Sequence, residues 1–179
     1  MRPAEVHLLL GENGAGKSTL MKIVAGMHHR DGGEMLWKGQ AVNFRNPAEA
    51  ARAGIAMVHQ ESLLAPHLTV AENIFLGREE HLPLGWVNRK SMMRRAARLI
   101  ESHGFPLQAD WRVDRLSPAG KQLVEICRAL EHEASLLIFD EPTSSLSESE
   151  TREVFRIVRK LRERGTGVIY ITHRLDELR

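Results

Sequence analysis

A glycine-rich loop near the start of the chain constrains its fold more than any other feature. Residues 11–19 read Gly-Glu-Asn-Gly-Ala-Gly-Lys-Ser-Thr and fit the pattern G-x-x-x-x-G-K-[ST]. Glycines let a backbone turn tightly and bring its N–H groups close to an anion. The apolar run 6–10 predicts a buried strand before the loop, and residues 18–25 predict a helix after it, whose N-terminal dipole favours an anion. With both flanks present, we interpret the loop as a phosphate-binding P-loop rather than an incidental glycine-rich turn.

The side chains of this loop suit the phosphates of a nucleotide. Lys17 would supply a point positive charge between the outer phosphates, and the Ser18 hydroxyl is a ligand for Mg²⁺. The predicted nucleotide-binding residues are Gly11, Glu12, Asn13, Gly14, Ala15, Gly16, Lys17, Ser18 and Thr19.

Two acids follow another apolar run, residues 136–139, and are Asp140 and Glu141. In a P-loop protein the first acid holds Mg²⁺ and the second polarises a water for attack on the γ-phosphate. An apolar run that ends in two acids is common by itself. The combination with a P-loop is specific, because both belong at the carboxyl ends of neighbouring strands in a parallel sheet.

Two polar residues also follow predicted strands. Gln60 comes soon after the apolar run 55–58, so its amide is predicted to reach the metal or the attacking water. His173 directly follows the run 167–172, so its imidazole is predicted to meet the γ-phosphate. Each would be an ordinary surface residue without the other motifs.

A serine-capped helix follows further along the chain. Ser117 is predicted as its N-cap, with Pro118 at the first helical position. The Ser117 hydroxyl and the N–H groups of Ala119 and Gly120 form a candidate anion site at the helix N-terminus. Ordinary helix capping explains the same residues, and this segment alone does not decide between the two.

Apolar strands alternate with helices along the chain and predict an α/β fold with a mostly parallel sheet. The pattern becomes helical from about residue 68 to 116, with a helix over 89–103 that Asn88 caps and Gly104 ends. The basic face of that helix is interpreted as solvated rather than as a binding patch. We expect a core of residues 1–66 and 125–179, with residues 67–124 inserted as a helical subdomain.

Composition excludes several classes of protein. Apolar residues make up 42% and charged residues 27% of the 179 residues, as in globular domains. A net charge of +2 gives no reason to expect a nucleic-acid partner. The single cysteine, Cys127, excludes an internal disulfide and a cysteine-based zinc site. These features indicate a cytoplasmic protein.

The order of the motifs resembles that of the nucleotide-binding subunits of ATP-binding cassette (ABC) transporters, over essentially the whole chain. Residues 11–19 match the Walker A motif, Gln60 the Q-loop, and 116–122 the signature segment. Asp140 and Glu141 match Walker B and its catalytic glutamate, residues 144–147 fall at the D-loop, and His173 matches the switch histidine. The resemblance implies a P-loop NTPase (RecA-like) fold and ATP with Mg²⁺ as its ligands.

The chain is more similar to bacterial importers of the ribose, galactose and xylose type. The segments that carry this resemblance are 58–61, 68–79, 123–126 and 172–177. The resemblance implies an ATPase that drives import of a monosaccharide and lies on the inner face of the cell membrane. Its partners would be a second cassette, fused or head to tail, a transmembrane permease and, indirectly, a periplasmic sugar-binding protein. The surface with Leu63, Leu64 and Leu68 either meets the permease or packs inside the insert.

The sequence departs from the family pattern at several points. Pro118 and Ala119 replace the two glycines that usually follow the signature serine, and Gly120 replaces a glutamine. Pro118 has no N–H, and the Ala119 methyl is expected to hinder close approach to phosphate. The cassette is expected to be truncated at both ends, without the usual aromatic residue before Gly11. The alternatives are therefore a non-transport ABC ATPase and a truncated fragment that binds nucleotide without turnover.

Overall fold

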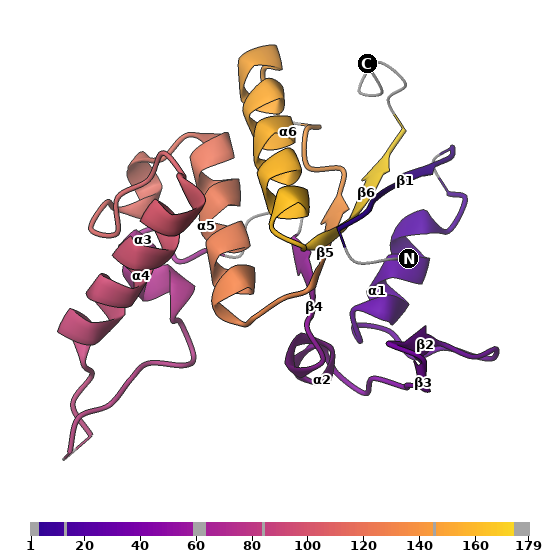
Figure 1. Cartoon of the computed structure of the whole chain (residues 1–179), viewed down its shortest axis with the longest axis horizontal. Coiled ribbons are helices and arrows are strands. Elements are labelled where there is room, and N and C mark those ends of the chain that lie inside the picture. The colour runs from indigo at the N-terminus through magenta and orange to yellow at the C-terminus, as the bar shows by residue number, and fades with distance from the viewer. Residues whose placement is uncertain (1–3, 13, 59–63, 84, 145, 174–179) are drawn as a thin grey trace. The chain divides into compact units, whose positions relative to one another are not determined.

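The computed structural model describes residues 4–12, 14–58, 64–83, 85–144 and 146–173. The chain divides into two compact units (Figure 1). The first unit contains residues 1–60, 132–142 and 161–179, and the second contains 61–131 and 143–160. These bounds differ from the expected division, since the second unit extends beyond residues 67–124 at both ends and also includes 143–160. The functional division into a core and an insert remains a prediction.

The first unit is built on a parallel sheet. Its four strands are β1 (Val6–Leu10), β4 (Ile55–Val58), β5 (Leu136–Asp140) and β6 (Gly167–Thr172), in the spatial order β1-β6-β5-β4. Every neighbouring pair is parallel. The unit also contains helices α1 (Lys17–Val24) and α2 (Pro47–Arg52) and the hairpin strands β2 (Leu36–Trp37) and β3 (Gln40–Ala41). The predicted α/β fold with a mostly parallel sheet is confirmed.

The register of the sheet brings the carboxyl ends of its strands to one edge. Leu10 at the end of β1 pairs with Thr172 of β6. Asp140 at the end of β5 pairs with Ile171 of β6, and Val58 of β4 pairs with Phe139 of β5. The loops that follow β1, β5 and β6 therefore start close together. The prediction that the strands before the P-loop and before the two acids are neighbours is wrong, because β6 lies between β1 and β5.

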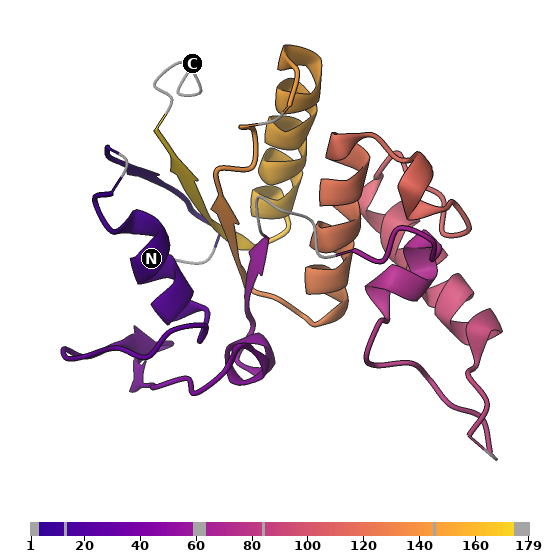
Figure 2. The ribbon, with the colours of Figure 1, turned by 180° about the vertical axis from the view of Figure 1, so that it is seen from behind.

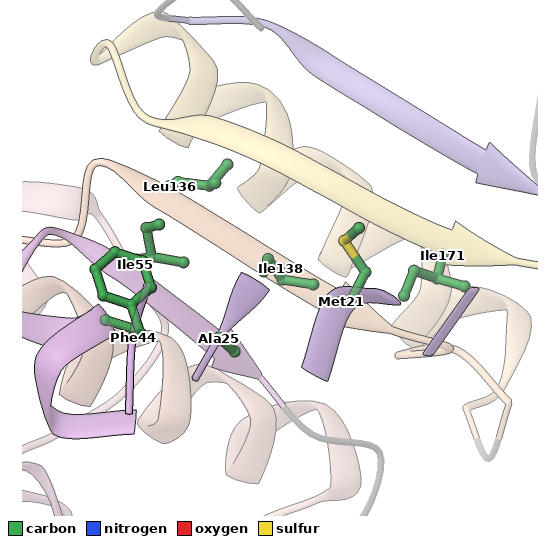
Figure 3. Close-up of a cluster of buried hydrophobic side chains, with 8 residues drawn as sticks. Met21, Ala25, Phe44, Ile55, Leu136, Ile138 and Ile171 are labelled. Carbon is green, nitrogen blue, oxygen red and sulfur yellow. The ribbon is translucent and has the colours of Figure 1, made fainter. Parts of the chain in front are cut away.

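A buried apolar cluster holds α1 against this sheet. Met21 of α1 and Ala25, the C-cap of that helix, pack with residues from β4, β5 and β6 (Figure 3). The buried members of the cluster are Met21, Ala25, Phe44, Ala50, Ile55, Leu136, Ile138 and Ile171. Burying each large apolar side chain contributes about 1.5–3 kcal/mol. This packing fixes the first turn of α1, which is part of the P-loop.

The second unit is helical. It contains α3 (Val70–Ile74), α4 (Arg89–His103), a 3-10 turn η1 (Val113–Arg115), α5 (Pro118–Glu131) and most of α6 (Glu148–Glu163). Figures 1 and 2 show α3, α4 and α5 side by side. The predicted helix 89–103 is confirmed: the Asn88 side chain accepts a hydrogen bond from the Ser91 N–H, and Gly104 ends the helix with φ 59°.

Backbone hydrogen bonds join the segment 109–113 to the start of α3. The Val70 N–H donates to the carbonyl of Trp111 at 2.8 Å, and the Ala71 N–H donates to the carbonyl of Ala109 at 2.9 Å. The Val113 N–H donates to the carbonyl of Leu68 at 3.1 Å. The segment just before the signature is therefore held to a capped helix rather than left as a free loop.

In the part of the chain that the structure describes, none of the helices combines the length and apolar character needed to cross a membrane.

Candidate functional site

The glycine-rich loop connects β1 to α1 with two left-handed glycines. Gly14 has φ 85° and Gly16, the N-cap of α1, has φ 83°, a conformation that glycine adopts without steric cost. The Ala15 N–H donates to the carbonyl of Glu12 at 3.2 Å, which closes a turn inside the loop. Thr19 lies in the first turn of α1, and Asn13 lies outside the described residues.

The ammonium group of Lys17 folds back over this loop. Its Nζ donates to the carbonyl oxygens of Gly11 at 2.7 Å and Glu12 at 2.9 Å. The side chain passes over Gly11, where an added Cβ would lie 3.5 Å from Lys17 Cδ. A positive charge is thus held at the mouth of the loop by two neutral acceptors.

Ser18 and Asp140 meet at the edge of the sheet, although 122 positions separate them in the sequence. The Ser18 hydroxyl donates to Asp140 Oδ1 at 2.8 Å, and the pair is partly buried. A hydroxyl and a carboxylate are the hard oxygen ligands that Mg²⁺ takes in proteins. The side chains present fit a magnesium ion that binds with nucleotide phosphates.

Glu141 and His173 form a second polar pair at the same edge. The Nδ1 atom of His173 lies 3.0 Å from Oε1 of Glu141. The Glu141 backbone is left-handed, with φ 47°, and its N–H donates to the carbonyl of Ile171 at 3.1 Å.

The sheet thus brings Lys17, Ser18, Asp140, Glu141 and His173 to one edge of the first unit. Gln60 lies outside the described residues, so its predicted approach to this edge stays a prediction.

Backbone N–H groups at the N-terminus of α5, in the second unit, already have hydrogen-bond partners within the chain. The Gly120 N–H donates to the Ser117 hydroxyl oxygen at 3.1 Å, which is ordinary helix capping. Ala119 is only 2% exposed, so its methyl does not project from the helix end. Its N–H faces the carboxylate of Glu150. The predicted anion site at Ser117, Ala119 and Gly120 therefore depends mainly on the Ser117 hydroxyl in this structure.

The contact between Glu150 and the Ala119 N–H at this helix end was not predicted from the sequence. Close in sequence, the partner of Glu150 is Ser147, whose backbone N–H and hydroxyl donate to its carboxylate at 3.0 and 2.8 Å. These two bonds lower the pKa of Glu150, and the bond from the Ser147 backbone N–H has the larger effect. The Ala119 N–H lowers this pKa further. The contact with Ala119 joins segments far apart in sequence, and no local pattern predicts it.

Comparisons with known proteins identify the family of the chain. Residues 1–144 match the family model described as ABC transporter. The chain is 48% identical over 99% of its length to a putative ribose/galactose/methyl galactoside import ATP-binding protein of Agrobacterium fabrum. It is 52% identical over 98% of its length to a ribose import ATP-binding protein of Rubrobacter xylanophilus. It spans 35% of the length of each of these relatives.

A solved structure shares the fold. The chain superposes with a TM-score of 0.84 and 28% identity on an ATP-binding cassette of an ABC transporter in its ADP conformation, over 98% of this chain and 73% of that one. The residues that match the family model include the P-loop and both acids of the site. The solved structure has the fold described above. The chain belongs to the ABC transporter family.

Proposed function

We propose that this chain binds and hydrolyses ATP and couples the hydrolysis to import of a monosaccharide. The observation that carries the proposal is the Ser18–Asp140 and Glu141–His173 pairing at the sheet edge where the P-loop begins. A phosphate cradle, oxygen ligands for Mg²⁺ and a carboxylate for the attacking water are the parts that phosphoryl transfer to water requires.

The P-loop would bind the phosphates of ATP. Backbone N–H groups of residues 11–16 and the Thr19 side chain would surround them, and the Lys17 ammonium would exchange its two carbonyl partners for phosphate oxygens. The exchange replaces neutral acceptors with charged ones, so it favours binding of the nucleotide. Ser18, Asp140 and Gln60 would hold Mg²⁺, which neutralises charge on the phosphates when bound.

Glu141 would orient and deprotonate the attacking water. The Glu141 side chain is 23% exposed, so solvent reaches it. With a proton on Nδ1, His173 donates to Glu141 and holds the carboxylate in place. Gln60 and His173 would also sense the γ-phosphate, as the resemblance to the family implies.

A second cassette would complete the site, with Ser117, Ala119 and Gly120 of one copy facing ATP on the other. The names of the relatives support a sugar importer of the ribose and galactose type. A transmembrane permease would then be a direct partner and a periplasmic sugar-binding protein an indirect one. The chain would lie in the cytoplasm, on the inner face of the membrane.

The proposal is tested by MgATP turnover of wild type beside Lys17→Ala. Lys22→Ala is the matched control, because Lys22 lies in the last turn of the same helix, away from the loop. We expect turnover in wild type and in the control, and loss of both ATP binding and turnover in Lys17→Ala. Equal ATP affinity in all three proteins would exclude this P-loop as the nucleotide site.

Import is tested separately in cells. Cells that carry Lys17→Ala in this gene should lose uptake of labelled ribose or galactose, whereas Lys22→Ala should retain it. Normal uptake of both sugars in the Lys17→Ala cells, beside lost ATPase activity, would favour the non-transport alternative.

A further inference from the structure

A short hairpin lies between α3 and α4 in the second unit and is formed by residues 80–83 and 85–88. Figures 1 and 2 show the chain between these two helices leaving the rest of the second unit as a narrow loop. Its base is closed by a backbone hydrogen bond, in which the Asn88 N–H donates to the carbonyl of Glu80 at 2.6 Å. The hairpin is therefore a defined element that carries its side chains away from the helices.

The tip of this hairpin exposes large apolar side chains. Trp86 is 74% exposed, Leu82 46% and Val87 40%, and Trp86 is the most exposed large apolar side chain among the described residues. The Leu82 N–H donates to the carbonyl of Trp86 at 2.7 Å, and Val87 pairs with His81 in an isolated antiparallel β-bridge. The three side chains thus belong to one turn. A cluster of exposed apolar side chains on an ordered element indicates a surface for a partner.

Basic residues follow the hairpin directly at the start of α4. Arg89 and Lys90 lie in the first turn of this helix, where the helix dipole favours acids, and that turn has no acid. Both side chains are exposed. Segment 78–98 contains six lysine and arginine residues against two acids, whereas the whole chain is nearly balanced, with 25 against 23. Helix stability does not explain the two charges in the first turn, but a neighbouring anion would.

Nearby acids offset only part of this positive charge. Three of them already have partners within the second unit: Glu72 with Arg89 at 3.2 Å, Glu79 with the Gly77 N–H at 3.0 Å, and Glu80 with Arg95. Lys90 takes part in none of the ion pairs found in the described parts of the chain. An apolar tip is therefore flanked by exposed positive charge.

This combination of side chains suits the surface of a bilayer with anionic lipids. Tryptophan rings settle at the level of the lipid headgroups, and other exposed apolar side chains reach the boundary with the acyl chains. Lysine and arginine residues near the surface are attracted to anionic headgroups. A protein partner would need an apolar pocket with acids around it, whereas such a bilayer supplies both chemistries over its whole surface. A tip with only a few apolar side chains therefore favours the bilayer.

We propose that the hairpin tip binds the surface of a bilayer that contains anionic phospholipids, with Trp86 and Leu82 among the headgroups and Arg89 and Lys90 facing their phosphates. The inference goes beyond the proposed function, because it assigns a lipid contact to this chain itself, without a permease and without ATP. It also gives a role to part of a helix whose basic face was expected to be merely solvated.

The test is co-sedimentation of the purified chain with lipid vesicles in the absence of nucleotide. One set of vesicles contains phosphatidylcholine alone, and the other contains phosphatidylcholine mixed with the anionic lipid phosphatidylglycerol. We expect the wild type to bind the mixed vesicles, to bind the neutral vesicles much more weakly, and to dissociate from the mixed vesicles at high salt, which screens the attraction.

Two variants separate the apolar contribution from the charged one. Trp86→Ala should lower the partition coefficient on mixed vesicles roughly tenfold, and Lys90→Ala should lower it about fivefold. The matched controls are Trp111→Ala, which removes an exposed tryptophan outside the hairpin, and Arg159→Ala, which removes an exposed positive charge from α6. Both controls should bind as the wild type does. Circular dichroism verifies that each variant is folded.

A folded wild type that does not bind the mixed vesicles would overturn the inference and leave a protein partner as the alternative for the hairpin. Unchanged binding of Trp86→Ala, or an equal loss in Arg159→Ala and Lys90→Ala, would also overturn it, since the contact would then not be made by the hairpin. The assay contains no ATP, so its failure would leave the proposed function intact, and a chain that binds vesicles but lacks turnover would refute only the proposed function.

Discussion

His173 and Glu141 approach each other across two neighbouring parallel strands, with 3.0 Å between the imidazole Nδ1 and the carboxylate Oε1. Glu141 makes this contact from an unusual backbone, whose φ of 47° lies in the left-handed region. Left-handed backbone is costly for a residue with a Cβ atom and is often found at functional sites. The end of β5 therefore accepts strain at the residue for which we propose a chemical role.

The strain at Glu141 predicts that a variant can gain conformational stability there while it loses activity. Glu141→Gly should be more stable than Glu141→Ala by about 1 kcal/mol, because glycine adopts positive φ without the Cβ clash. The free energy of unfolding is measured by urea denaturation of both variants. Neither variant should turn over ATP, since both lack the carboxylate.

Glu133 provides the control for that comparison, because it also has positive φ, 54°, and lies outside the site. Glu133→Gly should exceed Glu133→Ala in stability by a similar amount while both keep turnover. If Glu141→Ala were at least as stable as Glu141→Gly, the left-handed conformation at Glu141 would not be a source of strain.

The capping box at the start of α3 predicts a pH-dependent stability. The Thr69 N–H, and to a lesser extent its hydroxyl and Arg89, lower the pKa of Glu72 below its usual 4.5. A lowered carboxyl pKa contributes stability above about pH 4.5 that is lost as the pH falls through the folded-state pKa. Glu72→Gln keeps a side chain that can cap the helix but loses the negative charge, so it should be destabilised by roughly 0.3–1 kcal/mol near neutral pH.

The difference in stability between wild type and Glu72→Gln should shrink as the pH is lowered below about 4.5. Unfolding in urea at several pH values measures it. Glu101→Gln, at an exposed site near the end of α4, should show little difference at any pH. A Glu72→Gln difference that stayed constant down to about pH 3 would exclude the charged carboxylate as its source.

Burial of Cys127 predicts an inert thiol. Cys127 is 0% exposed in α5, and burial raises its pKa to about 12. Because the thiolate is the reactive form, folded protein at about pH 8 should react with a thiol reagent such as iodoacetamide far more slowly than protein in urea. Labelling is followed by mass spectrometry. Equal rates in both states would show that Cys127 is accessible in the folded chain.

Local signals in the sequence predicted the individual elements well. Asn88 and Gly104 mark the two ends of α4, because a side-chain cap and a left-handed glycine are local requirements of a helix. The apolar run before Asp140 predicted β5, and the P-loop glycines predicted a tight turn between β1 and α1. These features depend on neighbouring residues only.

The pairings across the sheet were harder to predict. The Ser18–Asp140 and Glu141–His173 contacts require the strand order β1-β6-β5-β4, which no local pattern specifies. The positive φ of Glu141 and the approach of Glu150 to Ala119 also arise from tertiary packing. The resemblance to a known family pointed to the same site residues, but not to these distances or to the satisfied N-terminus of α5.

The central claim is that Glu141 is the group that activates water for ATP hydrolysis. The most direct measurement is MgATP turnover and dimerisation, followed by light scattering, of wild type, Glu141→Gln and the control Glu133→Gln. Glu141→Gln should bind MgATP, lose turnover by roughly 10²–10⁴-fold and accumulate as an ATP-bound dimer, whereas Glu133→Gln should behave as wild type. Turnover of Glu141→Gln at the wild-type rate would contradict the account.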